Sequence, residues 1–295
     1  MAETRLWPLR RRANPYVPGQ GISSVDARVR VDPGKANTGS SAGRIEARDV
    51  TMTFETRRGT GLVEALSDLT VSIEPGEFIS LVGPSGCGKS TMLKIIAGLL
   101  QPTRGEVLID GVPVRSPRRS VGIMFQTPEL FPWRNVLQNV LLPIDIFGHE
   151  REYHTERARQ LLNMVGLSAF EKAYPRELSG GMQQRTALSR VLVADPAIIL
   201  MDEPFGALDE FTRERLNLEL LRIWEEARKT VVFVTHNIGE AVFLSDRVVV
   251  MDTAPGRVDA IVTVPLARPR TVQDMKDPAY TNCIFEIREY LGVER

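Results

Sequence analysis

The sequence predicts an α/β domain with a parallel core sheet, an antiparallel contribution from its first strands and an inserted helical segment. Three observations lead to this fold class. From residue 45 onwards, short apolar runs of strand length alternate with segments of helical periodicity. The early strands, at 45–54 and 69–73, precede the first helix. Between 127 and 178 the helical period dominates, which is typical of an insertion into an α/β core.

The elements are expected in a regular order along the chain. Strands are predicted at residues 45–54, 69–73, 77–82, 106–110, 121–125, 197–201, 231–235 and 247–251. A first helix is predicted from residue 91, and later helices at 135–142, 151–165, 178–194, 209–228 and 238–244, with Ser168 or Ser179 as a helix cap. We therefore expect one domain at 45–265, with its helical insertion at 127–178, and a helical tail at 266–295.

Residues 1–44 differ from the rest of the chain in composition. They contain four prolines and more basic than acidic residues, and they lack the apolar stretch of a signal peptide. A disordered basic extension is the simpler interpretation. The alternative is weak attraction of the three arginines at 10–12, beside Leu6, Trp7 and Leu9, to an anionic membrane face, at about 1 kcal/mol per charge.

Composition and charge limit the classes of function. Hydrophobic residues make up 43% and charged residues 25% of the chain, as in soluble globular proteins. The formal net charge is zero, so we expect no nucleic-acid partner. No apolar run approaches the roughly 18 residues of a membrane span. Cys87 and Cys283 are too few and too badly placed for a disulfide framework, which favours a reducing cytosol.

Residues 83–91 carry the most specific motif, G-x-x-x-x-G-K-[ST], between a predicted buried strand and a helix. Glycines let successive backbone N–H groups converge on an anion. Lys89 adds a positive charge for the β- and γ-phosphates, and Ser90 offers a hydroxyl to Mg²⁺. We therefore expect a nucleoside triphosphate to be bound by Gly83, Pro84, Ser85, Gly86, Cys87, Gly88, Lys89, Ser90 and Thr91.

Two further segments fit the same chemistry. Asp202 follows a buried strand, where α/β sheets place ligands, and we expect it to hold the metal with Ser90. Glu203 comes next and can polarise the attacking water as a general base. The segment Ser179-Gly180-Gly181 opens a predicted helix and offers a second anion site, although a plain serine cap before flexible glycines is an alternative.

The phosphate loop, Gln126, residues 178–183, residues 198–203, residues 207–209 and His236 together resemble the nucleotide-binding subunit of an ABC transporter. The resemblance covers about residues 45–265. It implies a P-loop NTPase core of the ABC ATPase type that binds ATP and Mg²⁺. It also implies that two such domains pair head to tail, with ATP between the phosphate loop of one and the Ser-Gly-Gly helix of the other.

Roles for single residues follow from the same resemblance. Ser179, Gly180 and Gly181 would contact the γ-phosphate held by the partner domain. Gln126 would link the metal and the attacking water to the helical insertion, His236 would hydrogen-bond the γ-phosphate, and Asp209 would organise the dimer contact. Phe54 occupies the adenine-stacking position, where tyrosine is commoner; a buried core aromatic is the alternative.

Local stretches at 130–136, 240–247, 255–257 and 265–270 resemble the ATPases of nitrate, sulfonate and taurine importers. That resemblance implies a homodimeric ATP-hydrolysing subunit, peripheral on the cytoplasmic face of the inner membrane. Its partners would be integral-membrane permease subunits and, through them, a solute-binding protein. An apolar patch of Phe131, Pro132 and Trp133 would dock a permease helix or pack in the core.

Two alternatives share the catalytic motifs. One is the ATPase of an ABC exporter or lipid-handling system, which would bind a permease without a solute-binding protein. The other is a non-transport ABC ATPase acting on ribosomes or DNA; such proteins usually carry two cores or long coiled-coil insertions, and neither is seen here.

Overall fold

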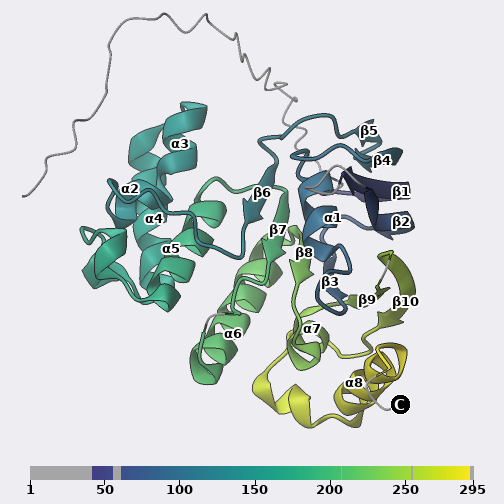
Figure 1. The fold of residues 1–295 in the computed structure, drawn as a ribbon. Helices are drawn as coiled ribbons and strands as arrows, with labels where there is room; N and C mark the ends of the chain where they lie inside the picture. The colour runs from purple at the N-terminus through teal and green to yellow at the C-terminus, as the bar shows by residue number, and fades with distance from the viewer. Residues whose placement is uncertain (1–41, 56–60, 207, 254, 293–295) are drawn as a thin grey trace, which may run out of the picture. The chain divides into compact units, whose positions relative to one another are not determined.

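The computed structural model describes residues 42–55, 61–206, 208–253 and 255–292. These residues form two β-sheets with helices around them (Figure 1). The basic extension expected at 1–44 lies, up to residue 41, outside the described residues, as does residue 207 of the predicted 207–209 motif.

The smaller sheet is antiparallel, as the early strands predict. Its strand order is β2-β1-β4-β5. The strands are β1 (Ile45–Glu55), β2 (Leu62–Ile73), β4 (Arg104–Ile109) and β5 (Val112–Pro113). The strand predicted at 69–73 begins earlier, at Leu62, because β2 stays paired with β1 as far as Glu55. Residues 62–64 are exposed, so they lack the apolar alternation that marks a strand in a sequence.

The larger sheet has the order β10-β9-β3-β8-β7-β6, and only β10 runs antiparallel to its neighbour. Its strands are β3 (Phe78–Val82), β6 (Val121–Met124), β7 (Ile198–Asp202), β8 (Thr230–Val234), β9 (Arg247–Asp252) and β10 (Arg257–Thr263). Every residue of β3, β7 and β8 is buried, because helices or the small sheet cover both faces. This burial explains their uninterrupted apolar runs.

Alternate residues of these strands serve two separate apolar clusters. Ile199 and Met201 pack with α5 (Gly180–Val193) and α6 (Glu210–Ala227), whereas Ile198 and Leu200 pack with α1 (Lys89–Ile96) and β1. The period of two therefore sends alternate side chains to the two faces of the sheet. Because β3, β8 and β7 are parallel neighbours, their carboxyl ends lie side by side at one edge. No helix within the described ranges is long and apolar enough to cross a membrane.

The helices fall into groups (Figure 1). α2 to α5 gather beyond the β6 edge of the large sheet, and α8 lies beside β10. Their bounds are α1 (Lys89–Ile96), α2 (Val136–Val140), α3 (Leu142–Phe147), α4 (Arg151–Met164), α5 (Gly180–Val193), α6 (Glu210–Ala227), α7 (Ile238–Leu244) and α8 (Pro278–Tyr290), with 3₁₀ turns at Ser168–Phe170, Pro175–Glu177 and Val272–Lys276.

Two helix predictions differ in detail from the structure. The helix expected at 135–142 ends at Val140, and Pro143 starts a second short helix because proline suits the first turn. Of the two proposed caps, Ser179 caps α5 by accepting the N–H of Met182. Ser168 instead donates its hydroxyl to Asn163 Oδ1 and lies in a 3₁₀ turn.

Candidate functional site

The phosphate loop joins the end of β3 to the start of α1. Gly88 caps α1 with a φ of 90°, and a Cβ there would lie 2.4 Å from Leu66 Cδ2, so only glycine fits. Lys89 folds back over the loop and donates from Nζ to the carbonyls of Gly83 (2.8 Å) and Pro84 (2.9 Å). The curled loop therefore carries its positive charge next to converging N–H groups, the arrangement that holds phosphates.

A hydroxyl and a carboxylate meet beside the loop. Ser90 donates from Oγ to Asp202 Oδ1 at 2.9 Å, which joins the first turn of α1 to the end of β7. Burial of Asp202 raises its pKa, and the hydrogen bond from Ser90 opposes that effect. A buried carboxylate next to a hydroxyl is the oxygen donor set that Mg²⁺ prefers, so these residues fit the ion.

The described parts of the chain contain no group of three or more His, Cys, Asp or Glu side chains arranged to hold a metal alone. Mg²⁺ in nucleotide sites usually binds through one or two carboxylates, waters and phosphate oxygens. The donor set at Ser90 and Asp202 is of that kind.

Three strand ends bring the other predicted catalytic residues together. Glu203 follows β7 with a φ of 45°, and its N–H donates to the carbonyl of Val234 at the end of β8. Gln126, just beyond β6, donates from Nε2 to Glu203 Oε2 at 3.1 Å. His236 follows β8, and its Nδ1 lies 3.5 Å from the same oxygen. The amide of Gln126 and the imidazole of His236 thus both lie next to one carboxylate oxygen, Glu203 Oε2.

The segment Ser179-Gly180-Gly181 is not part of this cluster. The side chain of Ser179 caps α5. A Cβ added at Gly180 would meet nothing within 4 Å among the atoms that the structure places, whereas one at Gly181 would lie 2.7 Å from Leu208 Cδ2. In the described ranges no hydrogen bond joins this segment to the phosphate loop. The two segments predicted to bind anions are therefore separate within one chain.

Phe54 and the Phe131 patch are both accessible to ligands. Phe54 lies near the end of β1, paired with Val63, and is 38% exposed, so it is not a core residue. Trp133 is 70% exposed and stacks on the ring of Phe131 at 5.0 Å. The alternative prediction, that these side chains pack in the core, is therefore wrong for Phe54 and for Trp133.

One polar contact of the site was absent from the sequence expectations. Gln184 on α5 is buried and donates from Nε2 to the carbonyl of Gln126 at 2.7 Å. It joins the helix that begins at Gly180 to the loop that carries Gln126. A polar residue on the apolar stripe of α5 was the available signal.

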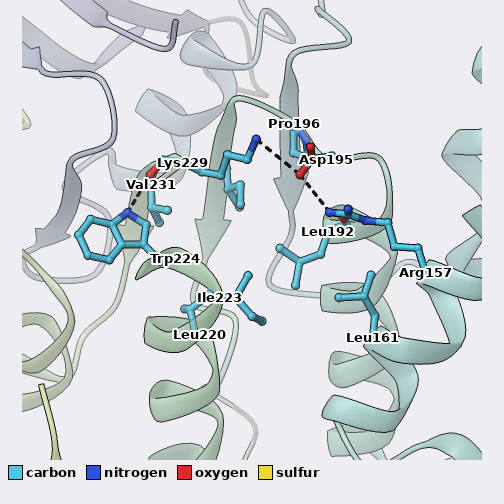
Figure 2. A pocket seen from close by; sticks show the side chains of 11 residues that line it. Arg157, Leu161, Leu192, Asp195, Pro196, Leu220, Ile223, Trp224, Lys229 and Val231 are labelled. Atoms are coloured by element: carbon cyan, nitrogen blue, oxygen red, sulfur yellow. Dashed lines mark hydrogen bonds and ion pairs between the residues drawn. The ribbon is translucent and has the colours of Figure 1, made fainter. Parts of the chain in front are cut away.

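A separate apolar cavity lies between α4, α6 and the start of β7 (Figure 2). At its rim, Asp195 accepts a hydrogen bond from Arg157 Nη2 at 3.0 Å and lies 3.5 Å from Lys229 Nζ. None of the predicted site residues lines it, so it is distinct from the nucleotide site.

A phosphate loop, a hydroxyl–carboxylate pair and a further carboxylate at the ends of parallel strands define a P-loop nucleoside triphosphatase. The model of the ABC transporter family matches residues 66–206. An uncharacterized ABC transporter ATP-binding protein of Methanocaldococcus jannaschii is 47% identical over 244 residues, which are 83% of this chain and 91% of that protein. The chain belongs to the ATP-binding proteins of ABC transporters.

Other relatives agree. An aliphatic sulfonates import ATP-binding protein of Bacillus cereus is 44% identical over 234 residues, 79% of this chain and 92% of that protein. The dimeric structure of MJ0796, described as a bacterial ABC transporter cassette, has a TM-score of 0.69 and 38% identity over 76% of this chain and all of that one. A second structure of that cassette holds ADP and Pi. The predicted family, fold class, ATPase activity and ligands, ATP and Mg²⁺, are confirmed.

Proposed function

We propose that this chain energises a membrane importer for a small anionic solute such as nitrate, an aliphatic sulfonate or taurine. The observation that supports this most is the 44% identity to the sulfonate import protein over 92% of that protein's length. The stretches at 130–136, 240–247, 255–257 and 265–270 support the same group of importers. Nitrate, sulfonates and taurine all carry a compact oxyanion, which other subunits would recognise.

In the proposed site, residues 83–91 cradle the phosphates and Lys89 neutralises their charge. Ser90, Asp202 and Gln126 hold Mg²⁺, which would supply charge neutralisation at the phosphate oxygens. Phe54 stacks on the adenine; a stacked base contributes about 1–3 kcal/mol, by analogy with nucleic-acid stacking. The exposure of Phe54 and the Ser90–Asp202 contact support these assignments.

Hydrolysis is assigned to Glu203, His236 and Gln126. Glu203 Oε2 takes the proton of the attacking water. Gln126 and His236 orient that carboxylate now, at 3.1 and 3.5 Å, and would turn to the water and the γ-phosphate once ATP is bound. The shared oxygen explains why the three residues act as a unit.

Two copies of the chain would pair head to tail in this proposal. The open end of α5, at Ser179, Gly180 and Gly181, supports this arrangement because it is accessible and directs helix N–H groups outwards. Asp209 caps α6 by accepting the N–H of Thr212, and that bond lowers its pKa, so it presents a fixed negative charge beside residues 203–208. The dimeric form of the MJ0796 cassette supports the same pairing.

The permease would dock on the helical insertion at 127–178, within an ATPase domain at 45–265 that precedes the tail at 266–295. Trp133 offers an exposed ring, and buried Asn139 fixes the loop below it through Phe131 N (2.8 Å) and the carbonyls of Phe131 (3.1 Å) and Arg134 (2.8 Å). A nearby apolar groove between β6, α3 and α5 includes exposed Ile146. An apolar permease helix suits such a surface. The chain would then be peripheral, on the cytoplasmic face of the inner membrane.

The test is recovery of partners from detergent-solubilised membranes with tagged Glu203→Gln chain and MgATP. Lys89→Ala serves as the control that cannot hold ATP, and Trp133→Ala as the control for docking. A multi-span permease and a solute-binding protein carrying an oxyanion support the proposal. A permease alone favours the exporter alternative, and ribosomal proteins or DNA would contradict a transport role.

A further inference from the structure

A closed ring of hydrogen bonds surrounds the backbone of His236. Thr235 donates its hydroxyl to Glu240 Oε2. The N–H of Asn237 donates to Thr235 Oγ1 at 3.0 Å, and the N–H of Glu240 donates to Asn237 Oδ1 at 3.0 Å. These bonds join the residues on both sides of His236, so they fix the backbone from which its side chain projects.

The carboxyl of Glu240 is more deeply buried than a cap residue requires. It is 8% exposed, and burial raises its pKa, while the Thr235 hydroxyl, the Asn217 amide and the Arg213 guanidinium act in the opposite direction. A carboxylate in the first turn of a helix interacts favourably with the helix dipole, and it does so from an exposed position too. The dipole therefore does not explain why this acid is buried.

The groups that face Glu240 from α6 lead to the loop after Glu203. Arg213 donates from Nη2 to the carbonyl of Leu208 at 2.9 Å and from Nε to that of Phe205 at 3.4 Å. Asn217 is 5% exposed, and its Oδ1, like Glu240 Oε1, makes no hydrogen bond with the described residues. Glu240 thus lies where α6 and the His236 segment meet.

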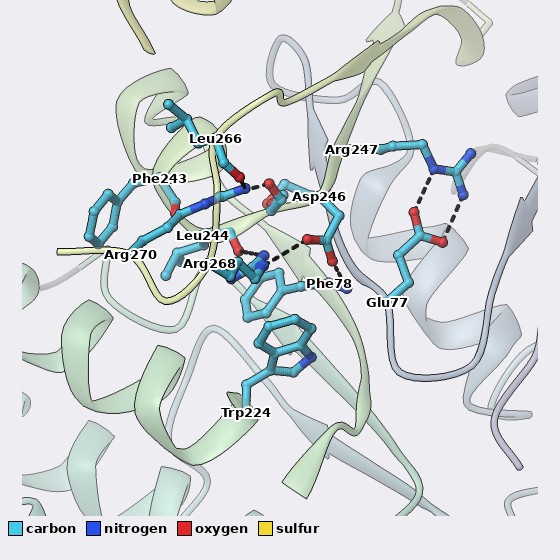
Figure 3. A network of polar contacts seen from close by, with 12 residues as sticks. Glu77, Phe78, Trp224, Phe243, Leu244, Asp246, Arg247, Leu266, Arg268 and Arg270 are labelled. Carbon is cyan, nitrogen blue, oxygen red and sulfur yellow. Dashed lines mark hydrogen bonds and ion pairs between the residues drawn. The ribbon is translucent and has the colours of Figure 1, made fainter. Parts of the chain in front are cut away.

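The other end of α7 is fixed by the C-terminal segment (Figure 3). Buried Arg270 donates to the carbonyls of Val242 (3.1 Å), Phe243 (2.8 Å) and Ser245 (2.9 Å), and burial lowers its pKa to about 10. Arg268 stacks on Trp224 at 4.0 Å and pairs with Asp246 at 2.8 Å. The C-terminal end of α7 is thus held by buried contacts, and Glu240 lies at its other end, in the first turn.

We infer that Glu240 is a positioning residue for His236 and that Arg213, which donates to the carbonyls of Phe205 and Leu208, couples this position to the segment after Glu203. The inference rests on the proposed role of His236 at the γ-phosphate. A change at Phe205 or Leu208, close to the proposed dimer contact, would thereby reach His236 without passing through the nucleotide. In the described residues, Glu240 makes no hydrogen bond to the phosphate loop or to Glu203.

The test measures kcat and the Kd for ADP on full-length variants with Mg²⁺. Glu240→Ala should lower kcat by about tenfold or more, the effect of removing a buried acceptor, while the Kd for ADP stays within about twofold. Thr235→Val should act alike, and the double variant should be no worse than Glu240→Ala alone. Glu240→Gln and Thr235→Ser keep the hydroxyl–oxygen bond and should restore most of kcat.

Two variants separate this inference from its alternatives. Leu216→Ala removes a buried side chain of α6 next to Asn217 and should lower Tm with kcat retained. If Leu216→Ala lowered kcat as much as Glu240→Ala, or if Glu240→Gln did not restore kcat, the role of Glu240 would be merely structural. A loss in His236→Ala but not in Glu240→Ala overturns the inference and leaves the proposed function standing. An unchanged kcat in His236→Ala would refute the role of His236 itself.

Discussion

The phosphate loop and the open end of α5 both bind anions in principle, yet they are built differently. At the loop, Lys89 and Ser90 already make hydrogen bonds of 2.8 to 2.9 Å to neighbouring carbonyls and to Asp202. At α5, Ser179 makes only a 3.4 Å cap, and Gly180 faces open space among the described atoms. The first region is held by buried strand ends and the second by a helix cap.

In the proposed site, the phosphate loop is then a preorganised half-site and the start of α5 is an incomplete one. Preorganisation lets the loop bind nucleotide without further ordering. The exposed N–H groups at the start of α5 bind water in the single chain, and in the proposed pairing a phosphate held by the other copy replaces that water. Variants at the two regions should therefore separate chemistry, binding and pairing.

The largest expected effect lies at the preorganised half-site. Glu203→Gln should bind ATP but lose roughly 10²–10⁴ in hydrolysis, since an amide cannot accept the proton from water. Single-turnover hydrolysis with excess enzyme measures the chemical step. Glu226→Gln, at an exposed position on α6, should hydrolyse ATP like the parent. Parent-like hydrolysis by Glu203→Gln would exclude Glu203 as the base.

A second variant tests binding at the same half-site. Lys89→Ala removes charge-assisted bonds to phosphate, each worth about 1.5–3 kcal/mol, so the Kd for ATP should rise roughly 10- to 150-fold. Calorimetric titration without turnover measures it. Lys94→Ala, exposed on the same helix, is the matched control and should bind as the parent does. An unchanged Kd for Lys89→Ala would contradict the view that the phosphate loop, unlike the start of α5, is preorganised to bind ATP.

The incomplete half-site is tested by two neighbouring glycines. Gly180→Ala has room for its methyl group, so Tm should not change. The added methyl group would obstruct the approach of the partner's phosphate to the helix N–H groups. Contacts of an anion with a helix N-terminus contribute about 0.3–2 kcal/mol, so ATP-dependent dimerisation in a Glu203→Gln background should weaken about 2- to 30-fold. Sedimentation analysis measures this equilibrium. Gly181→Ala should lower Tm as well, because its Cβ would collide with Leu208. Undiminished dimerisation by Gly180→Ala would contradict the pairing.

Strands buried on both faces were predictable from the sequence. β3, β7 and β8 are apolar throughout, so their existence and the α/β class follow from composition alone. β10 was missed because most of its residues are exposed, Ile261 among them, so it lacks the uninterrupted buried run of β3, β7 and β8. The break between α2 and α3 depends on Pro143. It was not predicted because the helical spacing of apolar residues continues across it.

The arrangement of the site residues was predictable only where a single local motif determines it. The phosphate loop and the strand-end position of Asp202 follow from local sequence. The meeting of Gln126, Glu203 and His236 depends on β6, β7 and β8 being neighbours, which is a property of strand order. Gln184 and Glu240 resemble surface residues of helices in a sequence, although both are buried. The roles of all these residues stay predictions.

The smallest expected effect is the pH dependence of stabilisation by MgADP, which should arise at Asp202 and not at the start of α5. Burial raises the pKa of Asp202, so the folded carboxyl keeps its proton above the ordinary aspartate value of 3.8. Without a cation, stability falls as the pH rises through that raised pKa, because the charged form is disfavoured in the fold. Mg²⁺ needs the carboxylate, so its stabilising effect with ADP should grow as the pH rises from 3.8 through the raised pKa of Asp202. Tm measured with and without MgADP records this growth, and Asp202→Asn should abolish it. The N-terminus of α5 contributes no titrating group to the bound phosphate, so Gly180→Ala should leave the pH dependence unchanged and alter only the dimer.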